Sequence, residues 1–132
     1  MIKYERAQDI DAMMHNIIDI LKMHHIKKER VIAMRSRGSA SKRTLARCHT
    51  FSRIIQKALD IKAHYIIEVI SEEFDKLSEE DKIKTLIHEL MHVPKSMGGG
   101  FKHHGNYVTR KNVEIMYKEY IARKSNTLYA RL

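Results

Sequence analysis

Apolar residues recur three or four positions apart in the first part of the chain, which is the spacing of one face of an α-helix. Between residues 4 and 25 no glycine or proline interrupts them, and they are Ile10, Met13, Met14, Ile17, Ile18 and Leu21. The same spacing recurs over residues 52–59 and over residues 108–123. We therefore expect an N-terminal helix, a short helix in the middle of the chain and a helix near the C-terminus.

β-branched and small apolar residues mark the segments that we expect to be strands. Residues 30–37 are rich in them, a Gly-Ser-Ala-Ser cluster follows, and residues 44–48 come next. This order is typical of a β-hairpin. Residues 65–70, with the sequence YIIEVI, give the strongest strand signal in the chain. The sequence thus predicts a small sheet of about three strands.

Another helix is expected to begin after Ser78, because its hydroxyl can cap the helix and three acidic residues follow in the first turn. The apolar positions of this segment form one stripe, made of Ile83, Leu86, Ile87 and Leu90. Pro94 disfavours helical geometry in the residue before it, so the helix should end there. The expected fold class is α+β, with this helix beneath the sheet and the C-terminal helix closing the domain.

The helix beneath the sheet carries the sequence His88-Glu89-Leu90-Met91-His92. Histidines four positions apart lie one turn apart on the same side of a helix, so both imidazoles can bind one zinc ion at about 2.0–2.1 Å. These histidines should point away from the apolar stripe and into a cleft. Glu89 is turned around the helix, where it can accept a proton from a zinc-activated water. We expect one zinc ion per chain, with His88 and His92 as ligands and Glu89 as the catalytic base.

A catalytic zinc site needs a third protein ligand and an open position for water. His103 and His104 are the candidates, because the glycine run at residues 98–100 can fold the chain back toward the helix. Adjacent side chains diverge, so only one of the two should reach the ion. If neither does, Glu114 or Glu119 on the following helix becomes the candidate.

The size and composition of the chain narrow the class of protein. At 132 residues, we expect residues 1–132 to form one domain. One cysteine, a charged N-terminus and the absence of a long apolar segment indicate a cytoplasmic protein with no membrane contact.

The formal net charge is +9, and residues 27–47 hold eight basic residues and one acidic residue. This stretch predicts weak, nonspecific nucleic-acid binding, with a solvated basic surface as the alternative.

The run YIIEVISEEFDKLSEEDKIKTLIHELMHVPKSMGGGFKHHG resembles the predicted small metallopeptidases of archaea and phages. The resemblance extends from about Val31 to Tyr120, and HELMH is its specific part. More distantly, His88-Glu89, His92 and the later His104-Gly105 resemble the ligand pattern of the minimal zincins related to SprT and Spartan. This second resemblance favours His104 over His103 as the third ligand. The chain lacks the C-x-x-C pattern of a zinc ribbon, so the DNA-repair role of some of those proteins does not follow.

The hypothesis that unites these features is a zinc metallopeptidase acting on a peptide or protein substrate. By resemblance to zincins, Tyr65, Ile66, Ile67 and Glu68 would belong to the edge strand that binds an extended substrate through its main chain. Two alternatives stay open: a nucleic-acid-associated protein with a structural zinc site, and a phage-derived interaction protein with a degenerate site. Glu89 separates them, because a structural zinc site needs no base. The sequence specifies no oligomeric state.

Overall fold

The sheet is built around strand β4 (Tyr65–Ile70) in the computed structural model, which describes residues 1–100, 102 and 104–130. Strand β2 (Val31–Arg37) runs parallel to β4 on one side, and β3 (Ala46–His49) runs antiparallel to it on the other. Strand β1 (Lys3–Arg6) pairs antiparallel with β2, so the strand order is β1-β2-β4-β3. Together with the five α-helices of the described residues, this mixed sheet confirms the α+β class.

The predicted hairpin of residues 30–37 and 44–48 is wrong in its pairing. Both segments contain strands, but β4 lies between them. β4 can occupy the centre because five of its six residues are buried, as in strands that are covered on both faces. A parallel pair needs a long crossover, and residues 38–64 provide it. The pairing of β2 therefore depends on a strand that is distant in sequence, and the local order of apolar and turn residues does not predict it.

Strand β1 takes residues that the sequence assigns to the N-terminal helix. All four residues of β1 are exposed, so no alternation of apolar and polar residues marks it as a strand. The helix that follows, α1 (Gln8–Ile20), is correspondingly shorter than residues 4–25. The sheet thus has one strand more than the three expected.

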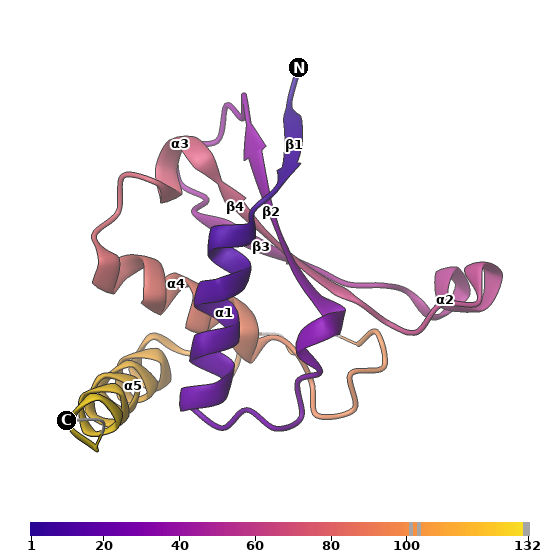
Figure 1. The fold of residues 1–132 in the computed structure, drawn as a ribbon. Coiled ribbons are helices and arrows are strands. Elements are labelled where there is room, and N and C mark those ends of the chain that lie inside the picture. Colours follow the sequence, from indigo (N-terminus) through magenta and orange to yellow (C-terminus); the bar gives the residue numbers. More distant parts are fainter. Residues whose placement is uncertain (101, 103, 131–132) are drawn as a thin grey trace.

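The other α-helices are α2 (Arg53–Leu59), α3 (Ser71–Phe74), α4 (Glu79–Met91) and α5 (Arg110–Ala130), and a short 3-10 helix spans Lys28–Arg30. α1 packs on β2 and α4 packs on β3, while α1, α4 and α5 contact one another. Figure 1 shows α2 apart from these helices, at the end of a long extension of β3 and β4. Among the described residues, none of the helices combines the length and the apolar character needed to cross a membrane.

Helix α4 begins as the sequence predicts, because the Ser78 hydroxyl accepts a hydrogen bond of 3.2 Å from the main-chain N–H of Asp81. The core between the sheet and helices α1 and α4 contains fully buried side chains, namely Ile10, Met14, Ile17, Tyr65, Ile67, Val69, Leu86, Ile87 and Leu90. Each such side chain stabilises the fold by roughly 1.5–3 kcal/mol. Burial of the apolar stripe of α4 fixes the rotation of the helix, and with it the direction of His88 and His92.

A network of charged side chains joins α1, β2 and α3. The Arg35 guanidinium donates to both carboxylate oxygens of Asp9, at 2.6 and 2.8 Å, and to Asp75, at 3.0 and 3.3 Å. Asp75 also accepts a hydrogen bond of 2.5 Å from the Ser71 hydroxyl. Hydrogen bonds from Arg35 lower the pKa of Asp9. Burial raises the pKa of Asp75, but the hydrogen bonds from Arg35 and Ser71 outweigh this effect, so the pKa of Asp75 is lowered as well. All charges of this network are therefore paired within the protein.

Candidate metal centre

Helix α4 places two histidines of the HELMH sequence side by side. His88 lies in the last turn of α4, and His92 directly follows its last residue with helical backbone angles. The two rings are 5.0 Å apart between centroids. His92 is buried and His88 is partly exposed.

His104 joins this pair from the loop before α5. Its Nε2 lies 3.0 Å from Nε2 of His88, and its ring centroid lies 4.8 Å from that of His92. The ligand nitrogens of the three residues all lie within 4.8 Å of one another, and no other group of three potential ligands is found among the described residues. Two ligands of a tetrahedral zinc ion are about 3.3 Å apart. These three imidazoles are therefore a candidate ligand set for a metal ion such as zinc.

The other residues predicted as candidates for the third ligand are His103, Glu114 and Glu119. His103 lies outside the described residues. Glu114 is held in an ion pair of 2.8 Å with Lys84, and Glu119 pairs with Arg123. Neither carboxylate belongs to the histidine cluster.

A hydrogen bond to the main chain orients His92. Its Nδ1 lies within hydrogen-bonding distance of the Lys102 carbonyl oxygen, and the Lys102 N–H donates to the His92 carbonyl oxygen at 2.8 Å. When Nδ1 is the donor, the imidazole is in the tautomer whose lone pair is on Nε2, the usual arrangement for a metal-binding histidine. The Lys102 carbonyl was not identifiable from the sequence, because every residue has a main-chain carbonyl and the residue type does not show which one accepts a hydrogen bond.

The glycine segment approaches the sheet closely, and this approach brings Lys102 and His104 to the cluster. The Tyr65 hydroxyl donates to the Gly100 carbonyl oxygen at 2.7 Å and accepts from the Gly99 N–H at 3.1 Å. Gly99 has φ of +97°, and a Cβ atom there would lie 2.2 Å from the carbonyl oxygen of Phe51. Only glycine combines this backbone angle with the contact. The GGG run is the sequence signal for this loop.

Burial shifts the pKa values of two groups in the cluster. Burial, followed by the charges of His92 and His104, lowers the pKa of His88 to about 4, which keeps its imidazole neutral near pH 7 as a metal ligand must be. Burial raises the pKa of Glu89 to about 7, and its carboxylate lies 4.0 Å from Nε2 of His88. On the facing strand β3, burial and then the Glu89 carboxylate raise the pKa of Cys48 to about 12, so this thiol is protonated.

The prediction that residues 65–70 form the edge strand beside the site is wrong. The main chain of residues 66–69 is paired with β2 on one side and with β3 on the other. The side chains of Tyr65 and Ile67 are fully buried, Glu68 is bonded to His49 at 2.7 Å, and Ile66 is partly exposed. These four residues are therefore not placed to add a substrate strand, and the edge strand that packs on α4 is β3.

Among the described residues, four of the eight basic residues in stretch 27–47 have acidic partners. The four ion-paired residues are Lys28 with Asp19, Arg35 with Asp9 and Asp75, Arg37 with Glu5, and Arg47 with Glu68. This pairing reduces the charge that could contact a polyanion. Nucleic-acid binding by this stretch stays a prediction, and salt-dependent retention of the protein on DNA would test it.

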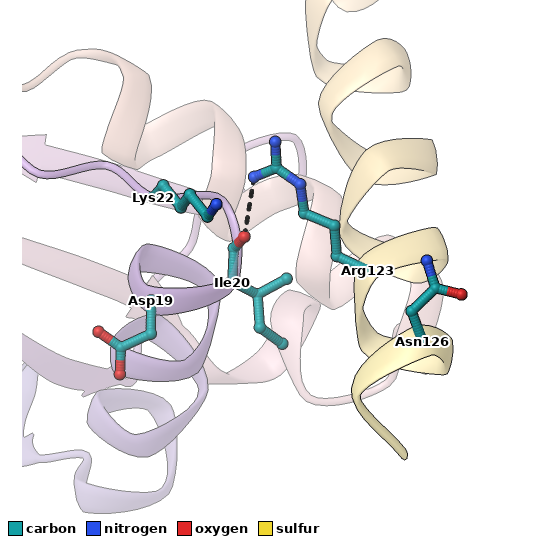
Figure 2. A pocket seen from close by; sticks show the side chains of 5 residues that line it. All are labelled: Asp19, Ile20, Lys22, Arg123 and Asn126. Atoms are coloured by element: carbon teal, nitrogen blue, oxygen red, sulfur yellow. Dashed lines mark hydrogen bonds between the residues drawn. The ribbon is translucent and has the colours of Figure 1, made fainter. Parts of the chain in front are cut away.

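A hollow lies between the end of α1 and α5, and the described residues that line it include no group of three potential metal ligands. Figure 2 shows its lining residues, with the Arg123 guanidinium of α5 donating to the Ile20 carbonyl oxygen at 2.9 Å. This bond satisfies a carbonyl in the last turn of α1, which has no partner within its own helix. The hollow is thus explained by the contact between two helices.

Comparison with known proteins agrees with the histidine cluster. Searches of curated proteins and of solved structures find no match. A family model described as "Putative phage metallopeptidase" matches residues 2–129. The match covers nearly the whole chain, including the HELMH helix and His104, and an α+β fold with three histidines at the end of α4 is consistent with a minimal zincin. The chain therefore belongs to this family of putative phage metallopeptidases.

Proposed function

We propose that residues 1–132 form a single-domain zinc metallopeptidase that hydrolyses peptide bonds in protein substrates. The observation that carries this proposal is the convergence of three histidine nitrogens within 4.8 Å, next to the buried carboxyl group of Glu89. A triad of histidine imidazoles is a typical ligand set for a catalytic zinc ion. Membership of the metallopeptidase family supports the same reading.

His88, His92 and His104 would hold the ion. A bound zinc ion supplies Lewis acidity, which polarises the substrate carbonyl and lowers the pKa of water. Glu89 accepts a proton from the attacking water on a carboxylate oxygen and then donates it to the nitrogen of the leaving amine, as the C–N bond breaks. The low exposure of Glu89, at 6%, limits competition from bulk water for this proton.

Replacement of Glu89 tests the proposed reaction. Glu89→Gln preserves the shape of the side chain but cannot carry the proton, so we expect peptidase activity to fall on the order of 10²–10⁴-fold while zinc content stays at about one per chain. Glu79→Gln, in the exposed first turn of the same helix, is the matched control and should keep full activity. Equal activity of Glu89→Gln and wild type, with zinc bound to both, would show that Glu89 is not the base.

Strand β3 is the proposed binding edge for an extended substrate. The Ile70 N–H donates to the Leu45 carbonyl oxygen at 2.9 Å, and hydrogen-bonded and non-hydrogen-bonded pairs alternate along an antiparallel ladder. Ala46 and Cys48 therefore direct their N–H and C=O groups away from β4. Both side chains are partly buried, and β3 packs on the helix that carries the histidines. A peptide paired with this edge would lie beside the cluster.

Proline at position 48 tests this edge without disturbing the β4 ladder. Cys48→Pro removes the outward N–H, so we expect kcat/KM for a peptide to fall about tenfold, mainly through KM, the effect of one lost hydrogen bond. Cys48→Ala removes the thiol but keeps the N–H, and should behave as wild type. If both variants have the same kcat/KM at equal zinc content, the substrate does not pair with Cys48.

A further inference from the structure

Helix α2 exposes an apolar surface that no described part of the chain covers. None of its seven residues is buried, and Ile54 is 78% exposed and Leu59 58% exposed. Ile55 and Ile61 are also exposed, at 41% and 42%, so four large apolar side chains gather within residues 54–61. A helix this short gains most of its stability from packing of its apolar face. Grouped exposed apolar residues of this kind mark an interaction site, whereas single ones do not.

Basic side chains border this apolar surface. Arg53, Lys57 and Lys62 line an open hollow along α2 together with Gln56, Asp60 and Ile61. Within the described residues, none of the three basic side chains forms an ion pair, in contrast to the paired arginines of the sheet. The surface therefore complements a partner that offers an apolar patch bordered by carboxylates.

The position of α2 connects it to the metal centre. α2 lies between β3 and β4 in the chain, so the edge strand beside the histidines leads directly into it (Figure 1). The Gln56 amide donates to the Gly98 carbonyl oxygen at 3.1 Å, and Gly99 lies against the carbonyl of Phe51. This glycine segment continues into Lys102 and His104. A protein bound on α2 would thus contact the segment that leads into the β3 edge and the glycine segment that leads to His104.

We propose that residues 53–62 form a docking surface for protein substrates, which binds an apolar patch edged by acidic side chains. The inference rests on the proposed peptidase function and adds the class of substrate. A second copy of the chain fits poorly, because a net charge of +9 makes two copies repel each other. A nucleic acid offers phosphates to the lysines but no apolar partner for Ile54 and Leu59. A protein with both features matches the whole surface.

Binding is measured without cleavage by using the Glu89→Gln protein and two designed 18-residue amphipathic peptides. One peptide carries a leucine face and a glutamate face, and the other has lysine in place of glutamate. By fluorescence anisotropy, we expect the glutamate peptide to bind at least tenfold more tightly. Ile54→Asp should weaken its binding at least tenfold and Lys57→Glu about threefold to tenfold, and both positions are exposed enough for the variants to fold. Ile115→Asp, at a 53% exposed isoleucine of α5, is the matched control and should change nothing.

Cleavage separates the docking surface from the proposed reaction. With Glu89 present, Ile54→Asp should slow the cleavage of casein at least fivefold and leave unchanged the cleavage of a ten-residue peptide that spans a mapped casein site. If neither substrate is cleaved but the designed peptide binds as expected, the peptidase proposal fails and the docking surface stands. If Ile54→Asp alters neither peptide binding nor casein cleavage, the docking surface is refuted. Dimerisation, or binding to anionic vesicles or DNA, that is lost in Ile54→Asp while the glutamate peptide fails to bind would also overturn it.

Discussion

Two clusters of polar side chains lie near the two ends of β4, and they differ in how their charges are satisfied. Arg35, the register partner of Val69, is bonded to two carboxylates, and every charge in that network has a partner of opposite sign. At the other end, Tyr65 holds the loop of the histidine cluster, where three imidazoles converge and the Glu89 carboxylate lies 4.0 Å from Nε2 of His88. Paired charges stabilise the fold, whereas converging imidazole nitrogens are typical donors to a metal ion. The comparison indicates a structural role for the first cluster and supports the metal site proposed for the second.

The largest expected effect is loss of zinc from the histidine cluster. His88→Ala, His92→Ala or His104→Ala should lower zinc content from about one per chain to near zero after dialysis against a mild chelator, because each removes a third of the protein ligands. Elemental analysis measures this. His24→Ala, at an exposed histidine outside the cluster, and Arg35→Met, in the other cluster, should retain the metal. Full occupancy in the triple histidine variant would place the ion elsewhere.

A smaller effect is expected from the loop that completes the cluster. Gly99→Ala puts a Cβ atom against the Phe51 carbonyl oxygen at a positive φ, so the loop must shift and carry His104 with it. We expect zinc affinity to fall about 10–100-fold, as for other residues that orient ligands. Gly98→Ala is the control, since among the described residues its Cβ would meet the Ser96 hydroxyl oxygen at an ordinary 3.5 Å. Similar zinc affinities for the two variants would mean that the loop does not position the ligand.

The smallest effect concerns the Arg35 network, where stability should change but zinc binding should not. Arg35→Met keeps the aliphatic stem and removes the guanidinium, which should cost about 1 kcal/mol and about 3–6 °C in Tm, since both carboxylates are partly solvated. Arg37→Met breaks only an exposed pair with Glu5 and should cost less. A larger loss of Tm in Arg37→Met than in Arg35→Met would contradict this ranking.

The same network predicts how stability depends on pH. The pKa values of Asp9 and Asp75 are lowered in the folded protein, so these groups stabilise it above their unfolded pKa of about 4, and that stability is lost as pH falls below this value through the folded pKa. Wild type should therefore lose Tm more steeply than Arg35→Met between about pH 5 and pH 3. Parallel Tm curves for the two proteins over this range would show that the network does not carry the pH dependence.

The sequence by itself determined the parts of this protein that depend on neighbouring residues. The Ser78 cap, the apolar stripe of α4 and the spacing of His88, Glu89 and His92 are local features, because one helical turn brings residues four apart together whatever the rest of the chain does. The strand at residues 65–70 and the short helix α2 were likewise predictable from runs of suitable residues.

Only the tertiary structure decided which segments meet. The parallel pairing of β2 with β4, the position of β3 at the edge and the return of His104 to α4 join residues far apart in the chain. The Lys102 carbonyl acts through the main chain, so residue type carries no record of it. The exposure of Ile54 and Leu59 was also decided by the tertiary structure. An apolar stripe has the same sequence pattern whether the fold buries it or leaves it exposed for a partner. Such features follow from the packing of the whole chain, in which distant contacts compete for the same surfaces.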